Sequence, residues 1–198
     1  MPKEKAPAPV VVDPDPAWRD RGAALAGELH AALAPLALHV EHIGSTAVPG
    51  MAAKPVFDLQ VSVSDLRQAE QAFDQPLAAL GFQRTIHQHD HVPAGCDDDP
   101  QRWTKRLWSR RGHSDADVNL HVRLLGSPER LALLFRDWFR AHPTAVPAYA
   151  ASSGAGDAVS DTGSYSDVKD PSSTWSSRCR ALGGRDQVDP HPGTSPGE

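Results

Sequence analysis

A short run of glycine, serine and threonine lies ahead of a single aspartate that sits within an apolar stretch. Gly44 lets the backbone approach a ligand closely, and Ser45 and Thr46 supply hydroxyls and amides that can bind phosphate oxygens. Lys54 would add a positive charge, and Asp58 could hold a Mg²⁺ ion that bridges those phosphates. These residue types suit phosphoryl or nucleotidyl chemistry. The alternative is that the glycines shape a connection between strands and that Asp58 is a solvated strand residue.

Two alternating segments would position these side chains. Residues 56–63 alternate apolar and polar positions, which predicts a strand with Asp58 and Gln60 on its polar face. Residues 117–124 alternate in the same way and place His121 on a polar face. If the two strands are neighbours, His121 lies beside Asp58.

Glu41 and His42 belong to another predicted strand, which ends just before Gly44. The ordinary assignment of His42 and His121 is a hydrogen-bonded structural histidine. The functional alternative is a polar pocket that contains both rings.

Two further segments carry chemically active side chains. RWTKRLWSRR, at residues 102–111, supplies Arg106 among several cations that could receive a triphosphate, with tryptophans able to stack on a base. Its charges divide between the two faces of a strand, so a solvated edge is an equal alternative. HQHDH puts His87, His89 and His91 on one face of a strand, a spacing that can bind transition metals. An exposed edge strand with titrating histidines is the plainer interpretation of this segment.

Three helices are predicted around these strands. Asp15 is placed to cap the first helix. Ser64 is placed to cap the second, which Pro76 should break or kink. The third begins near Ser127 and presents an apolar stripe over residues 131–139. Strands interleaved with helices predict an α/β (α+β) domain.

Length and composition limit the classes of protein. The 198 residues suit one domain, and the net charge of −5 gives no general reason to bind nucleic acid in bulk. No apolar run is long enough to span a membrane, and the two cysteines lack metal-binding spacing, so we expect a cytoplasmic protein without membrane association. Residues 1–9 are expected to form a flexible tail and residues 10–150 the folded domain. Residues 151–198 are rich in Ser, Gly and Pro, which predicts a largely disordered segment.

Five motifs resemble the GrpB family in order and in approximate spacing. They are DPAW at 15–18, EHIGSTAVPGMAAKP at 41–55, NLHV at 119–122, FRDWFRAHP at 135–143 and YSDVKD at 165–170. That family is assigned to the nucleotidyltransferase superfamily, so the resemblance implies a mixed β-sheet flanked by helices. A similar domain is appended to some actinobacterial dephospho-CoA kinases.

In that superfamily a Gly-Ser motif precedes a strand with two acidic residues two positions apart, and a third acidic residue lies on a neighbouring strand. Gly44 and Ser45 match the motif and Asp58 matches the first carboxylate, whereas Gln60 stands at the position of the second. Two-metal catalysis uses carboxylates to hold two cations about 4 Å apart, and a neutral amide supplies no charge. The resemblance therefore implies an incomplete set of carboxylates.

The third acidic position is also unfilled. Asn119 or His121 stands roughly where the third carboxylate would be sought, and Glu41 or Asp117 would have to compensate. The departure from the family pattern thus concerns the metal-binding half of the motif and leaves the Gly-Ser half intact.

The resemblance implies a protein that binds a nucleotide or another phosphorylated small molecule, with Mg²⁺-dependent nucleotidyl transfer as its active form. Asp58, His121 and Glu41 would be the catalytic residues, and Asp58 would also be the metal ligand. The nucleotide or phosphate would contact Gly44, Ser45, Thr46, Lys54, Arg106 and His42. A catalytically inactive binding or regulatory module, with a protein partner, is the alternative that Gln60 favours. A metal-binding protein that uses the three-histidine segment is a weaker alternative.

Two features set the sequence apart from a kinase and from the family pattern. It contains no G-x-x-x-x-G-K-[ST] motif, so the resemblance is to the appended domain and not to the kinase machinery. After Asp170 the family pattern calls for an apolar closing helix, whereas this chain continues without helical periodicity. A frameshift near codon 171 is one hypothesis, and resequencing the locus would test it.

Overall fold

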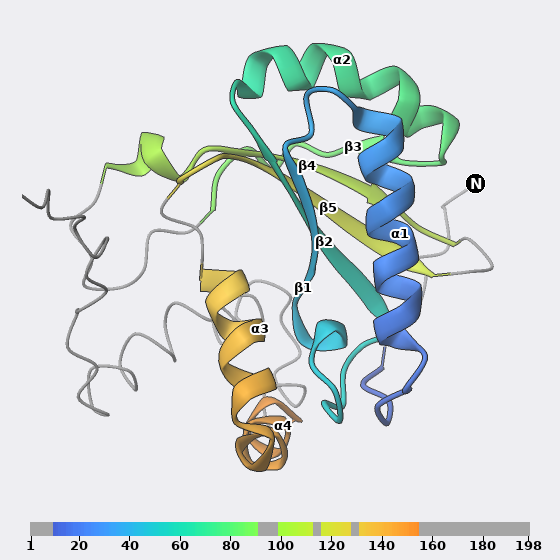
Figure 1. Cartoon of the computed structure of the whole chain (residues 1–198), viewed down its shortest axis with the longest axis vertical. Helices are drawn as coiled ribbons and strands as arrows, with labels where there is room; N and C mark the ends of the chain where they lie inside the picture. Colours follow the sequence, from blue (N-terminus) through green and yellow to red (C-terminus); the bar gives the residue numbers. More distant parts are fainter. Residues whose placement is uncertain (1–9, 91–98, 113–115, 128–130, 155–198) are drawn as a thin grey trace, which may run out of the picture.

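The computed structural model describes residues 10–90, 99–112, 116–127 and 131–154, which form one mixed sheet with helices around it (Figure 1). The strands are β1 (His39–Ile43), β2 (Val56–Val63), β3 (Gln83–Arg84), β4 (Lys105–Arg110) and β5 (Asp117–Leu124). The α-helices are α1 (Trp18–Leu33), α2 (Leu66–Ala79), α3 (Leu131–Ala141) and α4 (Val146–Gly154). Single-turn 3₁₀ helices are η1 (Ser45–Ala47), η2 (Pro100–Trp103) and η3 (Pro143–Ala145). The mixed α+β sheet confirms the predicted fold class.

The strand order is β1-β2-β5-β4-β3, and the central pair decides the geometry of the site. Strands β2 and β5 run parallel, whereas the other three pairs are antiparallel. Strand β5 reaches its place beside β2 only after the chain has formed α2, β3 and β4. The predicted bounds of β2 and β5, residues 56–63 and 117–124, agree with the structure.

One face of the sheet packs against α1 and α2; in Figure 1 α1 runs lengthwise along the sheet and α2 crosses its upper end. The apolar positions of β2 and β5 point into this layer, as their alternation predicts. The main core comprises Phe57, Leu59, Val61, Val118, Leu120 and Val122 from the sheet with Trp18, Leu29, Leu33, Leu66, Phe73 and Leu77 from the helices. The polar positions of β2 and β5 therefore lie on the opposite face.

A second, smaller core joins α3 and α4 to the loop that follows β1. Phe135 and Phe139 of α3 pack with Val48 and Met51 of the loop, and Val146 of α4 completes the cluster. The predicted apolar stripe of the third helix is thus confirmed. Its consequence is that the Gly-Ser-Thr loop is held between α1 on one side and α3 on the other.

The ends of the helices differ from those predicted. Helix α2 is capped by Asp65 rather than Ser64, because the Asp65 carboxylate accepts hydrogen bonds from the amides of Arg67 and Gln68. Pro76 does not break this helix. It lies in the last turn, where a proline removes one backbone hydrogen bond and the helix ends soon afterwards at Ala79.

The first helix begins at Trp18, two positions after the predicted start. The Asp15 side chain still caps the turn before it, by accepting the amide of Ala17 at 2.8 Å. Ahead of this turn, Val12 exchanges backbone hydrogen bonds with Ala53 as an isolated bridge. The predicted start of the third helix near Ser127 falls partly at residues 128–130, which lie outside the described residues.

The predicted strand with alternating histidines is mostly wrong. Only Gln83–Arg84 form strand β3, and His89 makes a single bridge to Thr104. His91, the tail at residues 1–9 and most of residues 151–198 lie outside the described residues. Within the described residues no helix is long and apolar enough to cross a bilayer.

Helix α1 meets the sheet at a glycine that leaves room for the ring of His42. A Cβ built on Gly22 would overlap the imidazole, whereas a Cβ on Gly27 of the same helix would meet nothing. The His42 Nε2 lies 2.9 Å from the hydroxyl oxygen of Thr46. Burial, followed by the charge of Arg140, lowers the pKa of His42 to about 4, so the ring is neutral at pH 7.

Two glycine-to-alanine variants test this contact within one helix. Gly27→Ala should raise the free energy of unfolding by about 0.5–1 kcal/mol, because alanine has the higher helix propensity. Gly22→Ala has the same propensity gain but should lower it by roughly 1–3 kcal/mol through overpacking against His42. Urea unfolding followed by circular dichroism measures both, and equal stabilisation by the two variants would contradict the packing.

Candidate functional site

The parallel pairing of β2 and β5 brings Asp58 beside two polar residues of the neighbouring strand. Asn119 is the register partner of Asp58, and its side-chain amide donates a 2.7 Å hydrogen bond to Asp58 Oδ1. His121 Nε2 lies 3.6 Å from the same oxygen. The Asp58 side chain keeps 32% of its surface exposed, so its carboxylate remains accessible. The prediction that His121 stands beside Asp58 is confirmed.

The Gly-Ser turn closes over this carboxylate. Gly44 has a φ of 74°, and a Cβ built there would lie 2.7 Å from Asp58 Oδ2. Only glycine tolerates both the backbone conformation and this proximity. Ser45 follows, half-buried, and its hydroxyl has no hydrogen-bond partner in the described parts of the chain. The structure therefore brings Gly44, Ser45 and Asp58 together, as the sequence suggested.

The electrostatics keep this pair in a defined protonation state. Burial raises the pKa of Asp58, but the hydrogen bonds and charge from His121 and Asn119 outweigh it, so the pKa is lower than usual. Burial lowers the pKa of His121, and the charges of Arg123 and Lys105 lower it further against the opposing effect of Asp58. At pH 7 an ionised carboxylate faces a neutral imidazole.

The position of the second carboxylate is occupied by an amide that binds a buried arginine. Arg123, which is 4% exposed, donates from Nη1 to Gln60 Oε1 at 2.8 Å. Its Nε and Nη2 donate to the two oxygens of Asp90 at 2.7 and 2.9 Å. Lys105 also donates to Asp90. A guanidinium group with its own counter-ion thus stands where the superfamily pattern would gather negative charge around a second cation.

The same arginine sets the tautomer of His121. Arg123 Nη2 lies 3.5 Å from His121 Nδ1, and because a guanidinium only donates, Nδ1 must accept. The proton of the neutral ring is then on Nε2, which faces Asp58. His121 is therefore oriented as a neutral donor beside the carboxylate.

The two carboxylates that would have to compensate for Gln60 have other partners. Glu41 lies half-buried opposite Gln60 in the register and pairs with Arg136 of α3 at 3.2 Å. Asp117 accepts the amide of Gly112 at 2.9 Å in the turn before β5. Each is on the polar face but is held by a structural contact.

Three of the expected phosphate contacts do not reach the site. His42 pairs with Leu59 in the register, so its ring points to the helix-covered face, and the expected pocket shared with His121 is wrong. Thr46 is buried, and its hydroxyl donates to the carbonyl of Val56 at 3.2 Å. Arg106 also lies on the helix-covered face, where its Nε donates to Glu70 of α2 at 2.6 Å.

Lys54 is half-buried in the loop before β2, and its backbone carbonyl accepts the amide of Val56. The tryptophans of the basic segment, Trp103 and Trp108, are buried, so they cannot stack on a base. This corrects the expectation that the segment receives a nucleotide. The charged side chains of the segment instead divide between the two faces of β4, as the alternative interpretation predicts.

No group of three potential metal ligands is gathered among the described His, Cys, Asp and Glu residues. His87 and His89 are exposed, His89 on an isolated bridge to Thr104, and His91 lies outside the described residues, so the three-histidine hypothesis stays a prediction. For a hard cation, Asp58 is the accessible carboxylate next to the Gly-Ser turn.

Sequence reasoning missed Asp90 and Arg136 as parts of the site. Arg136 of α3 donates to the backbone carbonyl of His42 and to Glu41, and Arg140 donates to the carbonyl of Ala47 at 3.0 Å. Arg136 and Arg140 are four residues apart and so lie on one face of the helix, which indicated that both could contact the same neighbouring segment. Asp90 gave no signal, because it lies on irregular backbone.

The relation to known proteins rests on a match to one family model. The model described as GrpB protein matches residues 8–176. The chain belongs to the GrpB family. A crystal structure of the conserved protein GrpB from Enterococcus faecalis has the same fold, with a TM-score of 0.58 at 24% identity over 73% of this chain and 80% of that chain.

GrpB-family relatives with curated names include longer proteins. A dephospho-CoA kinase of Mycolicibacterium paratuberculosis is 35% identical over 85% of this chain and 45% of its own length. A UPF0157 protein of Pseudomonas aeruginosa is 35% identical over 71% of this chain and 53% of its own length. The chain thus spans about half the length of the curated relatives it matches.

Substitutions at two glycines isolate the contact between the turn and Asp58. Gly44 and Gly50 both have a φ of 74°, but only at Gly44 would a Cβ meet the carboxylate, since the space at Gly50 is open. Gly50→Ala should lower the free energy of unfolding by about 1–2 kcal/mol through backbone strain. Gly44→Ala should lower it by at least about 1 kcal/mol more. Chemical denaturation of both variants gives the difference.

The additional loss of unfolding free energy in Gly44→Ala, compared with Gly50→Ala, should shrink when the Asp58 carboxylate is removed. In the double variant Gly44→Ala/Asp58→Ala, the new methyl group has space, so the penalty of Gly44→Ala should approach that of Gly50→Ala. An undiminished penalty would show that the close approach to Asp58 is not what requires a glycine here.

The ion cluster around Arg123 predicts a pH dependence. Burial raises the pKa of Asp90, but the hydrogen bonds and charges of Arg123 and Lys105 outweigh it and lower the pKa to about 2. Its stabilisation is therefore fully present above the ordinary pKa of 3.8 and is lost as the pH falls from there toward 2. The loss amounts to about 2 kcal/mol.

Asp90→Asn should lower the free energy of unfolding by roughly 3–5 kcal/mol at pH 6, because it leaves buried cations unpaired. Urea titrations at pH 6, 4 and 3 should show that the difference in free energy of unfolding between wild type and variant narrows as the pH falls. Other acid-sensitive groups, such as His42, are common to both proteins and cancel. A gap that stays constant over this range would contradict the assigned ion pairs.

Proposed function

We propose that this GrpB-family protein binds a phosphorylated small molecule, with a nucleotide as the first candidate, at the Gly44–Asp58 end of the polar sheet face. Binding uses at most one divalent cation, and the site does not carry out two-metal nucleotidyl transfer. The proposal combines an accessible carboxylate, a glycine turn pressed against it and a serine hydroxyl without a hydrogen-bond partner among the described residues. It corresponds to a binding or regulatory module on a nucleotidyltransferase-like fold.

The observation that carries this proposal is the hydrogen bond from Arg123 to Gln60. Two-metal transfer requires a second cation about 4 Å from the first, held by shared carboxylates. At that place the chain offers an amide oxygen already bound to a guanidinium group. Repulsion from the buried positive charge of Arg123 would oppose a second Mg²⁺.

A single Mg²⁺ fits the remaining donors. Mg²⁺ keeps several waters and is commonly held by one or two carboxylates together with substrate phosphates. Asp58 Oδ1 is engaged by Asn119, whereas Oδ2 faces the Gly44 turn. Asp58 would hold the ion, which would neutralise phosphate charge when bound.

The residues of the chain then have distinct roles. Gly44 permits close backbone approach, and the Ser45 hydroxyl would donate to a phosphate oxygen. His121, neutral and protonated on Nε2, would donate to Asp58 or to a ligand oxygen. Asn119 holds the carboxylate in position and is itself bound by Arg111 through its side-chain oxygen.

Nucleotidyl transfer remains the second candidate, because the family fold is nucleotidyltransferase-like. The named activity of the dephospho-CoA kinase relatives belongs to proteins of which this chain spans less than half. Coenzyme A and its precursors are therefore included among the test ligands as phosphorylated small molecules, without assigning kinase activity.

Calorimetric titration with ATP, GTP, CTP, UTP, dephospho-CoA and coenzyme A, each with and without Mg²⁺, tests the proposal. At least one ligand should bind, and Asp58→Asn should weaken its Mg²⁺-dependent part at least about tenfold, because the ion loses its charged ligand. Asp20→Asn makes the same chemical change on the exposed face of α1 and should leave binding unchanged.

A parallel assay for pyrophosphate release separates the two candidates. Binding without turnover supports the module. Release of pyrophosphate that Asp58→Asn abolishes would replace it with nucleotidyl transfer. Absence of binding by every ligand to a folded sample would refute both.

A further inference from the structure

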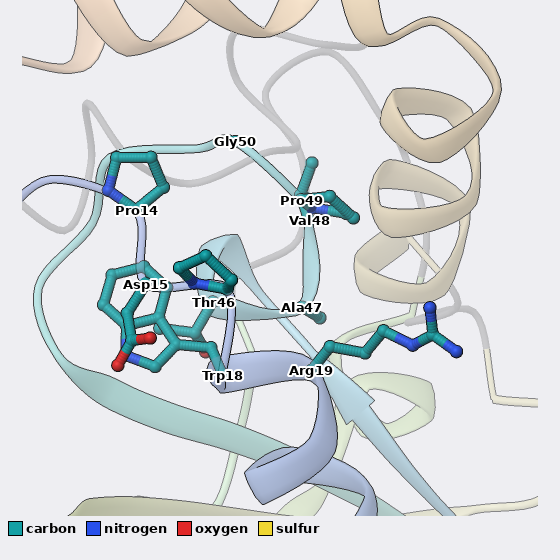
Figure 2. A pocket seen from close by; sticks show the side chains of 10 residues that line it. Pro14, Asp15, Trp18, Arg19, Thr46, Ala47, Val48, Pro49 and Gly50 are labelled. Atoms are coloured by element: carbon teal, nitrogen blue, oxygen red, sulfur yellow. The ribbon is translucent and has the colours of Figure 1, made fainter.

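A pocket lies against the second half of the loop that follows Gly44. It has a volume of about 370 Å³, within the range of small-molecule sites, and is formed by the entry to α1 and the second half of the loop (Figure 2). Its apolar walls come from Pro14, Pro16, Trp18, Ala47, Val48 and Pro49. Asp58, Asn119 and His121 are not among its lining residues. The pocket is thus separate from the site described above.

One arginine lines this pocket, and a second arginine from another helix binds one of the lining residues. Arg19 of α1 lines it, and Figure 2 shows the side chain extending past Ala47. Arg140 of α3 reaches the same residue, since its Nε donates to the Ala47 carbonyl at 3.0 Å. Among the described residues the remaining N–H groups of Arg140 have no hydrogen-bond partner, and Arg19 has only an exposed aspartate 4.0 Å away.

Within the described residues the neighbouring charges have close ion-pair partners, whereas the contact between Arg19 and Asp20 is long and exposed. Arg136 is paired with Glu41 and Asp137, and the Asp15 carboxylate that also lines the pocket is paired with Arg21 at 2.5 Å. Burial lowers the pKa of Arg140, and repulsion from Arg136 and Arg19 lowers it further against the effect of Asp137. Two guanidinium groups therefore lie near each other beside Ala47, one lining the pocket and the other bound to the Ala47 carbonyl.

The other polar groups of the pocket are already satisfied. The Thr46 hydroxyl is bound to His42 and to the Val56 carbonyl, and the Asp15 carboxylate accepts the Ala17 amide in addition to its ion pair. What remains for recognition is an apolar wall and two guanidinium groups, which suit planar, bidentate binding of carboxylate or phosphate oxygens.

We propose that this pocket, here called the Arg19–Arg140 pocket, binds a small amphiphilic anion. The apolar or aromatic body of the ligand lies against the exposed rings of Pro14, Pro16 and Pro49, and its phosphate or carboxylate group lies between Arg19 and Arg140. The site is independent of the proposed nucleotide site, because it shares neither Asp58 nor a metal with it.

Phenyl phosphate and benzoate are suitable probes of the full chain, since each combines an aromatic body with one of the two anionic groups. Benzyl alcohol supplies the body without charge, and inorganic phosphate supplies the charge without the body. Two-dimensional ¹H–¹⁵N NMR should show saturable shifts at Ala47, Val48 and Gly50 with an aromatic anion. Benzyl alcohol and inorganic phosphate should each bind at least about tenfold more weakly.

Substitutions of single arginines then test which guanidinium groups bind the anionic group of the ligand. Arg19→Gln removes an exposed guanidinium with no buried contact, so the fold should persist while the aromatic anion binds about tenfold more weakly. Arg140→Gln should weaken binding by at least as much. Arg67→Gln, on the exposed first turn of α2, is the matched control and should change nothing. Asp58→Asn should also leave this binding intact, whatever it does to nucleotides.

Three results would overturn the proposal. The first is an absence of shifts at Ala47 and Gly50 with both aromatic anions at millimolar concentration in folded protein. The second is equal affinity for benzyl alcohol, which would show that charge plays no part. The third is wild-type affinity in Arg19→Gln together with loss in Asp58→Asn, which would move the anion to the sheet face.

Discussion

The buried charge of Arg123 determines what the polar face of the sheet can do. A guanidinium group that is 4% exposed must be neutralised and hydrogen-bonded within the protein. Asp90 supplies the opposite charge through two hydrogen bonds, and Gln60 accepts a third. The remaining contact, with Nδ1 of His121, directs its Nε2 proton toward Asp58. Arg123 thus occupies Gln60 and Asp90, and Asp58 is left as the accessible carboxylate beside the Gly-Ser turn in the described part of the chain.

The loop after β1 depends on a different constraint, because it is held from both sides. Gly22 of α1 admits the ring of His42, which meets Thr46, and Arg140 of α3 binds the carbonyl of Ala47. The start of the loop is pressed against Asp58, while its second half lines a pocket. Two chemically different environments are consequently built on one rigid connection.

Much of this arrangement was accessible from sequence. The alternation of β2 and β5 gave their bounds and polar faces, because a period of two is set by strand geometry. Their adjacency required the tertiary fold, since α2, β3, η2 and β4 lie between β2 and β5 in the chain. Arg106 and His42 were misassigned for a related reason: one position along a strand reverses the face, and their strands gave no clear alternation. Asp90 required knowledge of which buried cation it would neutralise.

The two proposed sites select different anions because their positive groups differ. Mg²⁺ at Asp58 would be a strongly hydrated ion that prefers clustered phosphate oxygens and retains water. Guanidinium groups are weakly hydrated, planar and placed next to apolar surface, so Arg19 and Arg140 favour a ligand with one compact anionic group and an apolar body. A polyphosphate gains little from the apolar wall, and an aromatic acid gains little from the sheet face. The loop that separates these environments therefore also separates the ligands that each can hold.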